Sequence, residues 1–247
     1  CSAMTRKVQK PKSWDSKKVK SDRWSQPKID GCRAYNPEGT LLARTQKQHA
    51  NRYITSFFSK PEYIGFDGEL AAGPENSADL CRVTSSACGT IAGEPFVLWW
   101  VFDFVTEETA HLPYRARYAI MCERVKHYQS QGLCGHLRVV PYIECKTVAD
   151  VEAAHDHWMQ QGYEGSCIYN PDLPHKEGDS SAHHGGVNRI KDFVDSEAIV
   201  RELVEGDTNN NIAQINELGR TFRTSHQENK SPNGMVGSLI CEQLVDV

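Results

Sequence analysis

The apolar run between residues 96 and 105 constrains the fold more than any other stretch. It reads Phe-Val-Leu-Trp-Trp-Val-Phe-Asp-Phe-Val, and Asp103 is its one charged residue. A run of this length, rich in aromatic and β-branched residues, is typical of a strand that is covered on both faces. It is also far too short to span a membrane, and no other apolar run in the chain is longer. We therefore expect a sheet in which residues 96–105 form a central strand.

The segments around this strand mix further strands with helices. Pro113 is placed to open a helix of about five turns, with Tyr114, Tyr118, Met121 and Val125 on one side. Thr147 is placed to cap a second helix. Further strands are predicted at residues 63–70, 137–143, 164–169 and 189–193, and helical character at residues 51–60 and 75–87. Strands and helices do not alternate strictly, so we expect an α+β fold of mostly antiparallel sheets flanked by helices.

The character of the sequence changes after Asp195. Residues 199–204 and 235–241 have strand character, and the stretch between them is rich in Asn and Gly. We expect one domain at residues 1–194 and a second, all-β domain at residues 195–247 that is too short for a complete barrel.

The ends and the charge limit the possible partners. Residues 1–23 are rich in lysine and contain few apolar residues, which indicates a solvated tail; the alternative is a phosphate-contacting arm. The net charge is −4, so a nucleic-acid surface would be a local patch. The nine cysteines include no C-x-x-C pair, which indicates reduced thiols in a cytosol-like compartment.

Residues 26–33, Gln-Pro-Lys-Ile-Asp-Gly-Cys-Arg, carry the first chemical signal. On a strand, Lys28 and Asp30 would share a face, and the Asp-Gly pair favours a sharp bend before Arg33. Residues 41–47 are the predicted return strand of the hairpin. A lysine becomes a nucleophile when its surroundings favour the uncharged amine. A solvated lysine on a surface hairpin is the other interpretation of these residues.

Four further motifs follow in order: F-D-G-E-L at 66–70, V-F-D-F at 101–104, E-G at 164–165 and R-I-K at 189–191. With K-I-D-G-C-R at 28–33, they resemble the covalent nucleotidyltransferases, which comprise ATP-dependent DNA ligases, RNA ligases and mRNA capping enzymes. The chain looks most like the small bacteriophage-type DNA ligases. Residues 44–47 resemble the ligase segment S-R-x-G-K, with Gln46 in place of glycine. Residues 170–176 resemble D-P-x-x-x-Y-K, and residues 234–239 resemble the opening strands of the ligase OB domain.

The resemblance implies a role for each matching position. Lys28 would attack the α-phosphorus of ATP and carry AMP as a phosphoramidate. Glu69 would accept a hydrogen bond from the ribose, Phe102 would stack on the adenine, and Gln26 would lie beside the adenine edge through backbone groups. Glu164 would bind Mg²⁺. The remaining positions would contact sugar or phosphate: Arg33, Arg44, Arg189 and Lys191. Lysine is usual at both ends of the last motif, so Arg189 is a departure, and Asp67 is interpreted as a turn-former or a partner of the site.

The resemblance also implies the activity and the partners. The expected enzyme is a monomeric ATP-dependent DNA ligase that seals nicked duplex DNA, as in replication, repair and recombination. It would work in the cytoplasm, or in the host cytoplasm if a phage encodes it. Two alternatives stay open: an RNA ligase or capping guanylyltransferase, and an inactive nucleic-acid-binding relative. The second domain would be a partial OB fold, and the late basic motif that orients pyrophosphate in the family is not present in these 247 residues.

Overall fold

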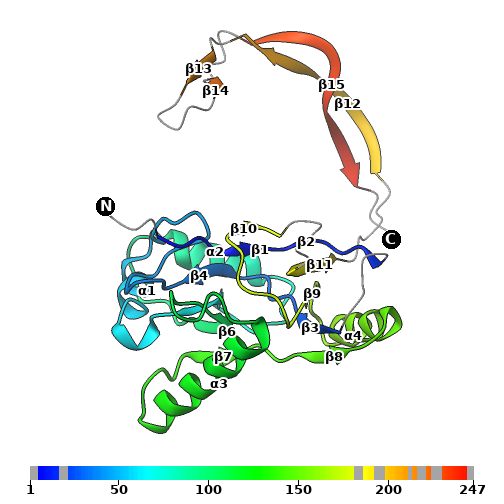
Figure 1. The fold of residues 1–247 in the computed structure, drawn as a ribbon. Coiled ribbons are helices and arrows are strands. Elements are labelled where there is room, and N and C mark those ends of the chain that lie inside the picture. The colour runs from blue at the N-terminus through cyan, green and yellow to red at the C-terminus, as the bar shows by residue number, and fades with distance from the viewer. Residues whose placement is uncertain are drawn as a thin grey trace. The chain divides into compact units, whose positions relative to one another are not determined.

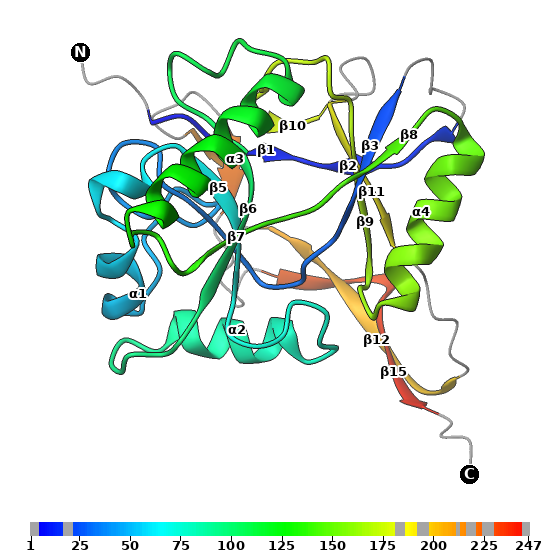
Figure 2. The same cartoon turned by 90° about the horizontal axis from the view of Figure 1, so that it is seen from below.

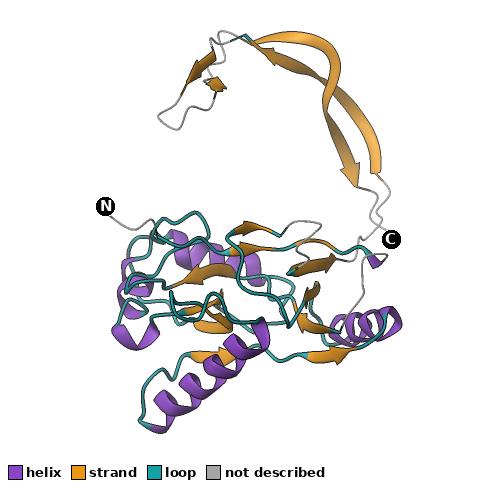
Figure 3. Ribbon diagram, viewed as in Figure 1, coloured by secondary structure: helices purple, strands orange, loops and turns teal. Residues whose placement is uncertain are grey.

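The computed structural model describes residues 5–16, 22–180, 186–191, 198–210, 213–215, 221–223 and 230–243. The chain divides into two compact units, Cys1–Asp192 and Phe193–Val247. In the described residues the first unit mixes helices and strands, whereas the second consists of strands (Figure 3). The expected α+β class is therefore confirmed. The expected boundary at residue 194 lies outside the described residues and stays a prediction.

A four-stranded sheet contains the apolar run. Its order is β4 (Cys32–Tyr35), β5 (Phe66–Ala71), β6 (Leu98–Phe104) and β7 (Leu137–Val139). Strand β6 lies between β5, to which it is antiparallel, and β7, to which it is parallel. The central position of the run is thus confirmed. Its two faces differ, because Trp99 and Val101 are fully buried whereas Trp100 and Phe102 are partly exposed.

A five-stranded sheet has the order β2 (Lys12–Ser13), β11 (Val187–Lys191), β9 (Gly165–Tyr169), β3 (Arg23–Pro27) and β8 (Ile143–Cys145). Its pairs are antiparallel except β2 with β11. The predicted single strand at 137–143 is wrong in detail, because it divides at Pro141 into β7 and β8. Proline cannot donate to a sheet ladder, and the two short strands belong to different sheets.

The expected solvated tail is wrong for the described part of the N-terminus. Strand β1 (Gln9–Lys10) pairs in parallel with β10 (Gly178–Asp179), and β2 pairs with β11. Val8 and Gln9 are buried, while the lysines at 7, 10 and 12 keep their side chains exposed. The backbone groups of this segment are satisfied by sheet edges, which a composition rich in lysine does not reveal.

The helices whose bounds the structure describes in the first unit are α1 (Arg52–Phe57), η2 (Pro61–Tyr63), α2 (Leu80–Gly89), α3 (Tyr114–Ser130) and α4 (Val148–Gln160). Helix α3 packs on β6 and β7, and α4 packs on β3, β8 and β9 (Figure 1, Figure 2). Thr147 and Asp150 form a capping box at the start of α4, as the capping prediction required. None of the helices in the described ranges has the length and apolarity needed to cross a bilayer.

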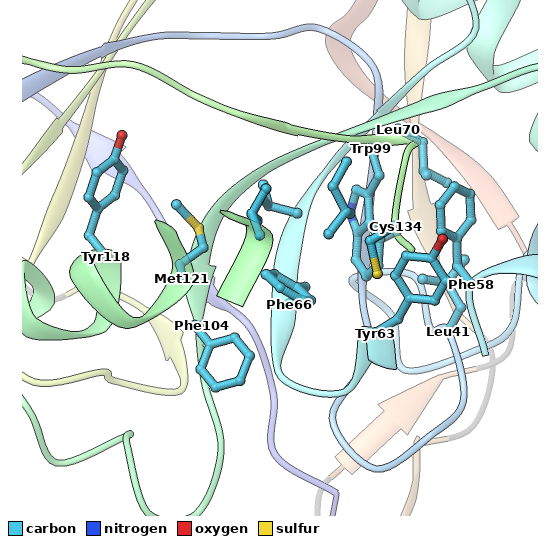
Figure 4. Close-up of a cluster of buried hydrophobic side chains, with 14 of the residues drawn as sticks. Leu41, Phe58, Tyr63, Phe66, Leu70, Trp99, Phe104, Tyr118, Met121 and Cys134 are labelled. Carbon is cyan, nitrogen blue, oxygen red and sulfur yellow. The ribbon is translucent and has the colours of Figure 1, made fainter. Parts of the chain in front are cut away.

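The main hydrophobic core lies against the buried face of β6 (Figure 4). Tyr114, Tyr118, Met121 and Val125 of α3 are all buried, as predicted from their spacing. The aromatic rings meet edge to face: the centroids of Phe58 and Trp99 are 5.3 Å apart, and those of Phe66 and Phe104 are 5.2 Å apart. The core therefore fixes β5 and β6, the strands that carry Glu69 and Phe102.

The second unit is described by itself. A long antiparallel pair, β12 (Ala198–Asn209) with β15 (Lys230–Gln243), accompanies a short one, β13 (Ala213–Ile215) with β14 (Thr221–Arg223). Irregularities in register interrupt the long pair at three places. The unit is built of strands in its described residues, as expected, and its assignment as a partial OB domain stays a prediction.

Candidate active site

A cavity of about 350 Å³ gathers eight of the nine predicted site residues. Its walls come from the four-stranded and five-stranded sheets, from residues 8–11 and from Asp179. The eight are Gln26, Lys28, Arg33, Arg44, Glu69, Phe102, Arg189 and Lys191. Glu164, the ninth, is outside the lining and interacts with Asp30, Lys28 and Lys191 beside it. Motifs separated by some 160 residues in sequence thus meet in one place.

Lys28 lies directly after a strand and not within it. Strand β3 ends at Pro27, and the Lys28 amide donates to the Gly165 carbonyl oxygen at 2.9 Å. The predicted strand through Asp30 is therefore wrong, because the chain leaves the sheet and buries Ile29 in a second apolar cluster. The Lys28 Nζ and the Asp30 Oδ1 are nevertheless 3.9 Å apart. The turn therefore brings the Lys28 amine close to the Asp30 carboxylate, as expected, although no strand does so.

Gly31 allows this turn to approach the four-stranded sheet. A Cβ atom at this position would lie 1.9 Å from the Leu70 carbonyl oxygen, so no side chain fits there. This close approach places the Lys28 segment beside β5 and Glu69. The glycine of the K-I-D-G motif is thus explained by packing.

The predicted return strand at 41–47 is also wrong. Leu42 makes one bridge to Tyr35, and the Ala43 amide donates to the Lys47 carbonyl oxygen across a tight turn. The main partner of β4 is β5, which is distant in sequence. Gln46 adopts a φ of 66°, the left-handed conformation that glycine favours. The turn therefore keeps the backbone shape that glycine would adopt, and Arg44 reaches the cavity from it.

Arg33 is held by the carboxylate of Asp67. Its Nε and Nη2 donate to the two Asp67 carboxylate oxygens at 2.7 and 2.8 Å. Its guanidinium also lies 4.7 Å from the centre of the Phe102 ring. The two hydrogen bonds to Asp67 fix the orientation of the Arg33 guanidinium, which covers one face of the Phe102 ring. Asp67, buried at 4% exposure, is therefore a partner of the site.

A buried chain of hydrogen bonds supports one wall of the cavity. The Gln26 side-chain amide donates to the Tyr114 hydroxyl at 2.7 Å, and this hydroxyl donates to the Phe102 carbonyl oxygen. Tyr114 stacks on Tyr169 with centroids 4.2 Å apart. The Gln26 side-chain amide therefore already has a hydrogen-bond partner inside the protein. Sequence reasoning missed Tyr169, although its two-residue spacing from Cys167 on β9 places both on the cavity side.

Arg189 and Lys191 lie two residues apart on β11 and both line the cavity with exposed side chains. Their expected common orientation follows from strand geometry. With Lys28 and Arg44 they give this part of the cavity a positive character suited to an anion.

Glu164 and Asp30 form a carboxylate pair at the edge of the site. Burial raises the pKa of Glu164, and the charge and hydrogen bond of Asp30 raise it further. Two neighbouring carboxylates are a fitting arrangement for a hard cation. In the described part of the chain, no group of three or more His, Cys, Asp or Glu side chains could hold a metal ion. The pair suits an ion such as Mg²⁺ that also takes ligands from substrate phosphates.

Burial raises the pKa of Glu69 to about 8, although Arg33 and Lys28 oppose the shift. The folded protein therefore prefers the protonated acid, and this contribution to stability is lost as pH rises from the unfolded value of about 4.3 toward 8. We expect the free energy of unfolding of Glu69→Gln, relative to that of the wild type, to rise by on the order of 1–3 kcal/mol as the pH is raised from 5 to 9. Urea unfolding of both proteins at pH 5, 7 and 9 measures the difference. A constant difference across this range would contradict the shift.

Neither the protein-family models nor the curated proteins match this sequence. Solved structures match it in three dimensions. Chlorella virus DNA ligase-adenylate aligns with a TM-score of 0.66 and 22% identity over 82% of this chain and 75% of its own. A Lig E DNA ligase aligns with a TM-score of 0.64 and 19% identity, covering 95% and 91%. The ATP-dependent DNA ligase of bacteriophage T7, in complex with ATP, aligns with a TM-score of 0.57 and 14% identity, covering 87% and 80%. The chain therefore shares its fold with these DNA ligases.

Proposed function

We propose that this protein is an ATP-dependent DNA ligase that seals nicks in duplex DNA through a lysyl-AMP intermediate. The observation that carries the proposal is the single cavity in which Lys28 meets Glu69, Phe102, Arg189 and Lys191. A solvated surface lysine would not share a cavity with these groups. The Lys28 side chain is 19% exposed, which leaves it open to a substrate while limiting its contact with water.

The first step transfers AMP to the protein. The Lys28 Nζ attacks the α-phosphorus of ATP, the bond to the pyrophosphate oxygen breaks, and the amine loses a proton. Arg189 and Lys191 would neutralise charge on the transferring phosphate. Phe102 and Tyr169 would hold the base, and Glu69 would accept a hydrogen bond from a ribose hydroxyl. A raised pKa suits Glu69 to such a position, because a ribose hydroxyl can donate to it or accept from it.

The next two steps join the strands. A 5′-phosphate oxygen at the nick attacks the phosphorus of lysyl-AMP, and Lys28 leaves with a proton. The 3′-hydroxyl then attacks the activated 5′-phosphorus, and AMP leaves. Arg44, and Arg33 within its pair with Asp67, would contact the phosphate or sugar groups in these steps. Glu164 with Asp30 would hold Mg²⁺, which supplies charge neutralisation when bound.

The second unit belongs to this proposal as a partial OB domain, with residues 1–194 as the adenylation domain. What supports it is the strand content of residues 198–243 in their described part. Basic residues of the second unit, such as Lys230, would contact the DNA backbone.

A sealing assay with matched nicks tests the proposal. We expect the protein with ATP and Mg²⁺ to seal a nick in duplex DNA and to act poorly on the same nick in duplex RNA. Preferred sealing of RNA would favour an RNA ligase, and transfer of GMP to an RNA end would favour a capping enzyme. If neither AMP uptake nor sealing is observed, the result would favour the inactive nucleic-acid-binding relative.

The charge on β11 gives a further prediction. Lys191→Ala is expected to lower the rate of AMP transfer to the protein by about 10²-fold, because it removes a cation that lines the cavity. Lys126→Ala, which removes an exposed lysine from α3, is the matched control and should retain the wild-type rate. Single-turnover transfer from labelled ATP measures both. Equal losses in the two variants would refute the placement of Lys191.

A further inference from the structure

Residues 5–14, here called the N-terminal strap, contribute residues 8–11 to one wall of the cavity. Val8, Gln9, Lys10 and Pro11 all belong to its lining. The strap is fixed along its length by backbone hydrogen bonds to β10 and β11. The Gly178 amide donates to Val8, the Ser180 amide donates to Lys10, and the Trp14 amide donates to Arg189. The backbone of Lys10 is therefore held in place while its side chain remains exposed.

The strap is also tied to residues of the motifs. The Arg33 Nη2 donates to the Gln9 carbonyl oxygen at 3.2 Å, and the Gln9 side-chain amide donates to the Ser180 hydroxyl at 3.3 Å. At the start of the strap, the Gln46 side chain donates to the Thr5 carbonyl oxygen at 3.0 Å. Glycine at position 46 could not make this last contact. The strap is thus a built part of the site.

The charges in the cavity show what Lys10 can do there. The lining contains six basic residues and three acidic ones. Arg33 is paired with Asp67, and Lys28 lies near Asp30. Within the ranges that the structure describes, Lys10 has no carboxylate within ion-pair distance, and the same holds for Arg44 and Arg189. Asp179, the register partner of Lys10 on β10, also lines the cavity. Basic residues still outnumber acidic ones in the lining, so Lys10 adds to a net positive charge.

We propose that Lys10 is a phosphate-binding residue of this cavity. The proposal rests on the nucleotide-dependent function above and extends it to a segment outside the five motifs. Lysine binds phosphate as a compact point charge, and a backbone fixed on both sides brings it to the site at low entropic cost. The phosphate belongs either to the nucleotide or to the 5′ end of a strand, and the two sources can be tested separately.

Binding measurements test Lys10 without relying on catalysis. All proteins carry Lys28→Ala to prevent covalent transfer, and Lys10→Gln is compared with Lys12→Gln. Lys12 is an exposed lysine of the same strap that does not line the cavity, so both changes remove one charge. The first arm measures affinity for ATP and for adenosine by calorimetry. The second measures affinity for nicked DNA with a 5′-phosphate and with a 5′-hydroxyl.

We expect Lys10→Gln to weaken binding about 10- to 100-fold in one arm, and only for the phosphorylated ligand, because a hydrogen bond to a charged group is lost. Lys10→Arg should restore most of it. Weaker binding of ATP would show that Lys10 binds a phosphate of the nucleotide. Weaker binding of the 5′-phosphorylated nick would show that it binds the phosphate of the DNA strand. Affinities equal to those of Lys12→Gln in both arms would overturn the proposal. The proposed function is tested separately with the wild-type protein, which has Lys28. If the wild type does not take up AMP, the proposed function is rejected, and this outcome is distinct from a result of the binding arms.

Discussion

Replacing Lys28 by alanine is expected to abolish covalent transfer of AMP to the protein. The amine that would form the phosphoramidate is gone, and no other described lysine except Lys10 and Lys191 lines the cavity. We expect the rate to fall by roughly 10³-fold or more, as for other essential nucleophiles. Labelled ATP with Mg²⁺, followed by denaturing electrophoresis, measures the covalent product. Acid should remove the label and base should not, as expected for a phosphoramidate.

Two control variants separate chemistry from folding. Lys28→Arg keeps a positive charge but offers no comparable nucleophile, so it should also fail to take up AMP. Lys126→Ala should be labelled like the wild type. Both Lys28 variants should still bind ATP without forming a bond, because the other lining residues remain. Label that persists in Lys28→Ala would show that another residue is the nucleophile.

Replacing Asp103 by asparagine is expected to destabilise the protein by about 3–5 kcal/mol. Asp103 accepts hydrogen bonds from the Arg117 Nε at 2.9 Å and Nη2 at 3.0 Å, and the two residues are 3% and 1% exposed. The change leaves a buried guanidinium without its counter-charge, held by the Leu112 and Leu173 carbonyl oxygens. Because Asp103 follows Phe102 on β6, partial unfolding here would also loosen the cavity. Urea unfolding followed by tryptophan fluorescence measures the effect.

The exposed pair of Asp79 and Arg82 provides the matched comparison. Asp79→Asn should leave the free energy of unfolding nearly unchanged, because solvent screens an exposed ion pair. The double variant Asp103→Leu with Arg117→Met should recover much of the loss, since no unpaired charge stays buried. A loss for Asp103→Asn as small as that for Asp79→Asn would contradict the importance of the buried pair.

Local patterns predicted the parts of the fold that depend on neighbours in sequence. The spacing of Tyr114, Tyr118 and Met121 gave the buried face of α3, because a helix repeats over a few residues. Arg117 on the same face was missed, since a charged residue is rarely buried unless it has a partner. That partner is Asp103 on a strand, which no local pattern connects to the helix.

Pairing between strands that are distant in sequence explains the larger errors in the predicted secondary structure. Gln9 pairs with Gly178, so the composition of the first residues could not reveal β1. The return strand at 41–47 failed for the same reason, because β5 takes the main pairing with β4. The gathering of the candidate residues was largely predictable, since eight of the nine residues named from the motifs line one cavity. Their roles stay predictions. Tyr169 was missed because it lies outside those motifs. For the N-terminal residues a solvated tail was favoured over a phosphate-contacting arm, because their pairing with distant strands leaves no local pattern.

The intact mass of the purified protein, measured before and after incubation with ATP and Mg²⁺, is the most direct test of the central claim. An increase equal to one adenylyl group, mapped by peptide analysis to the Lys28 segment and reversed by added pyrophosphate, is the predicted result. An unchanged mass under conditions in which ATP demonstrably binds would contradict it.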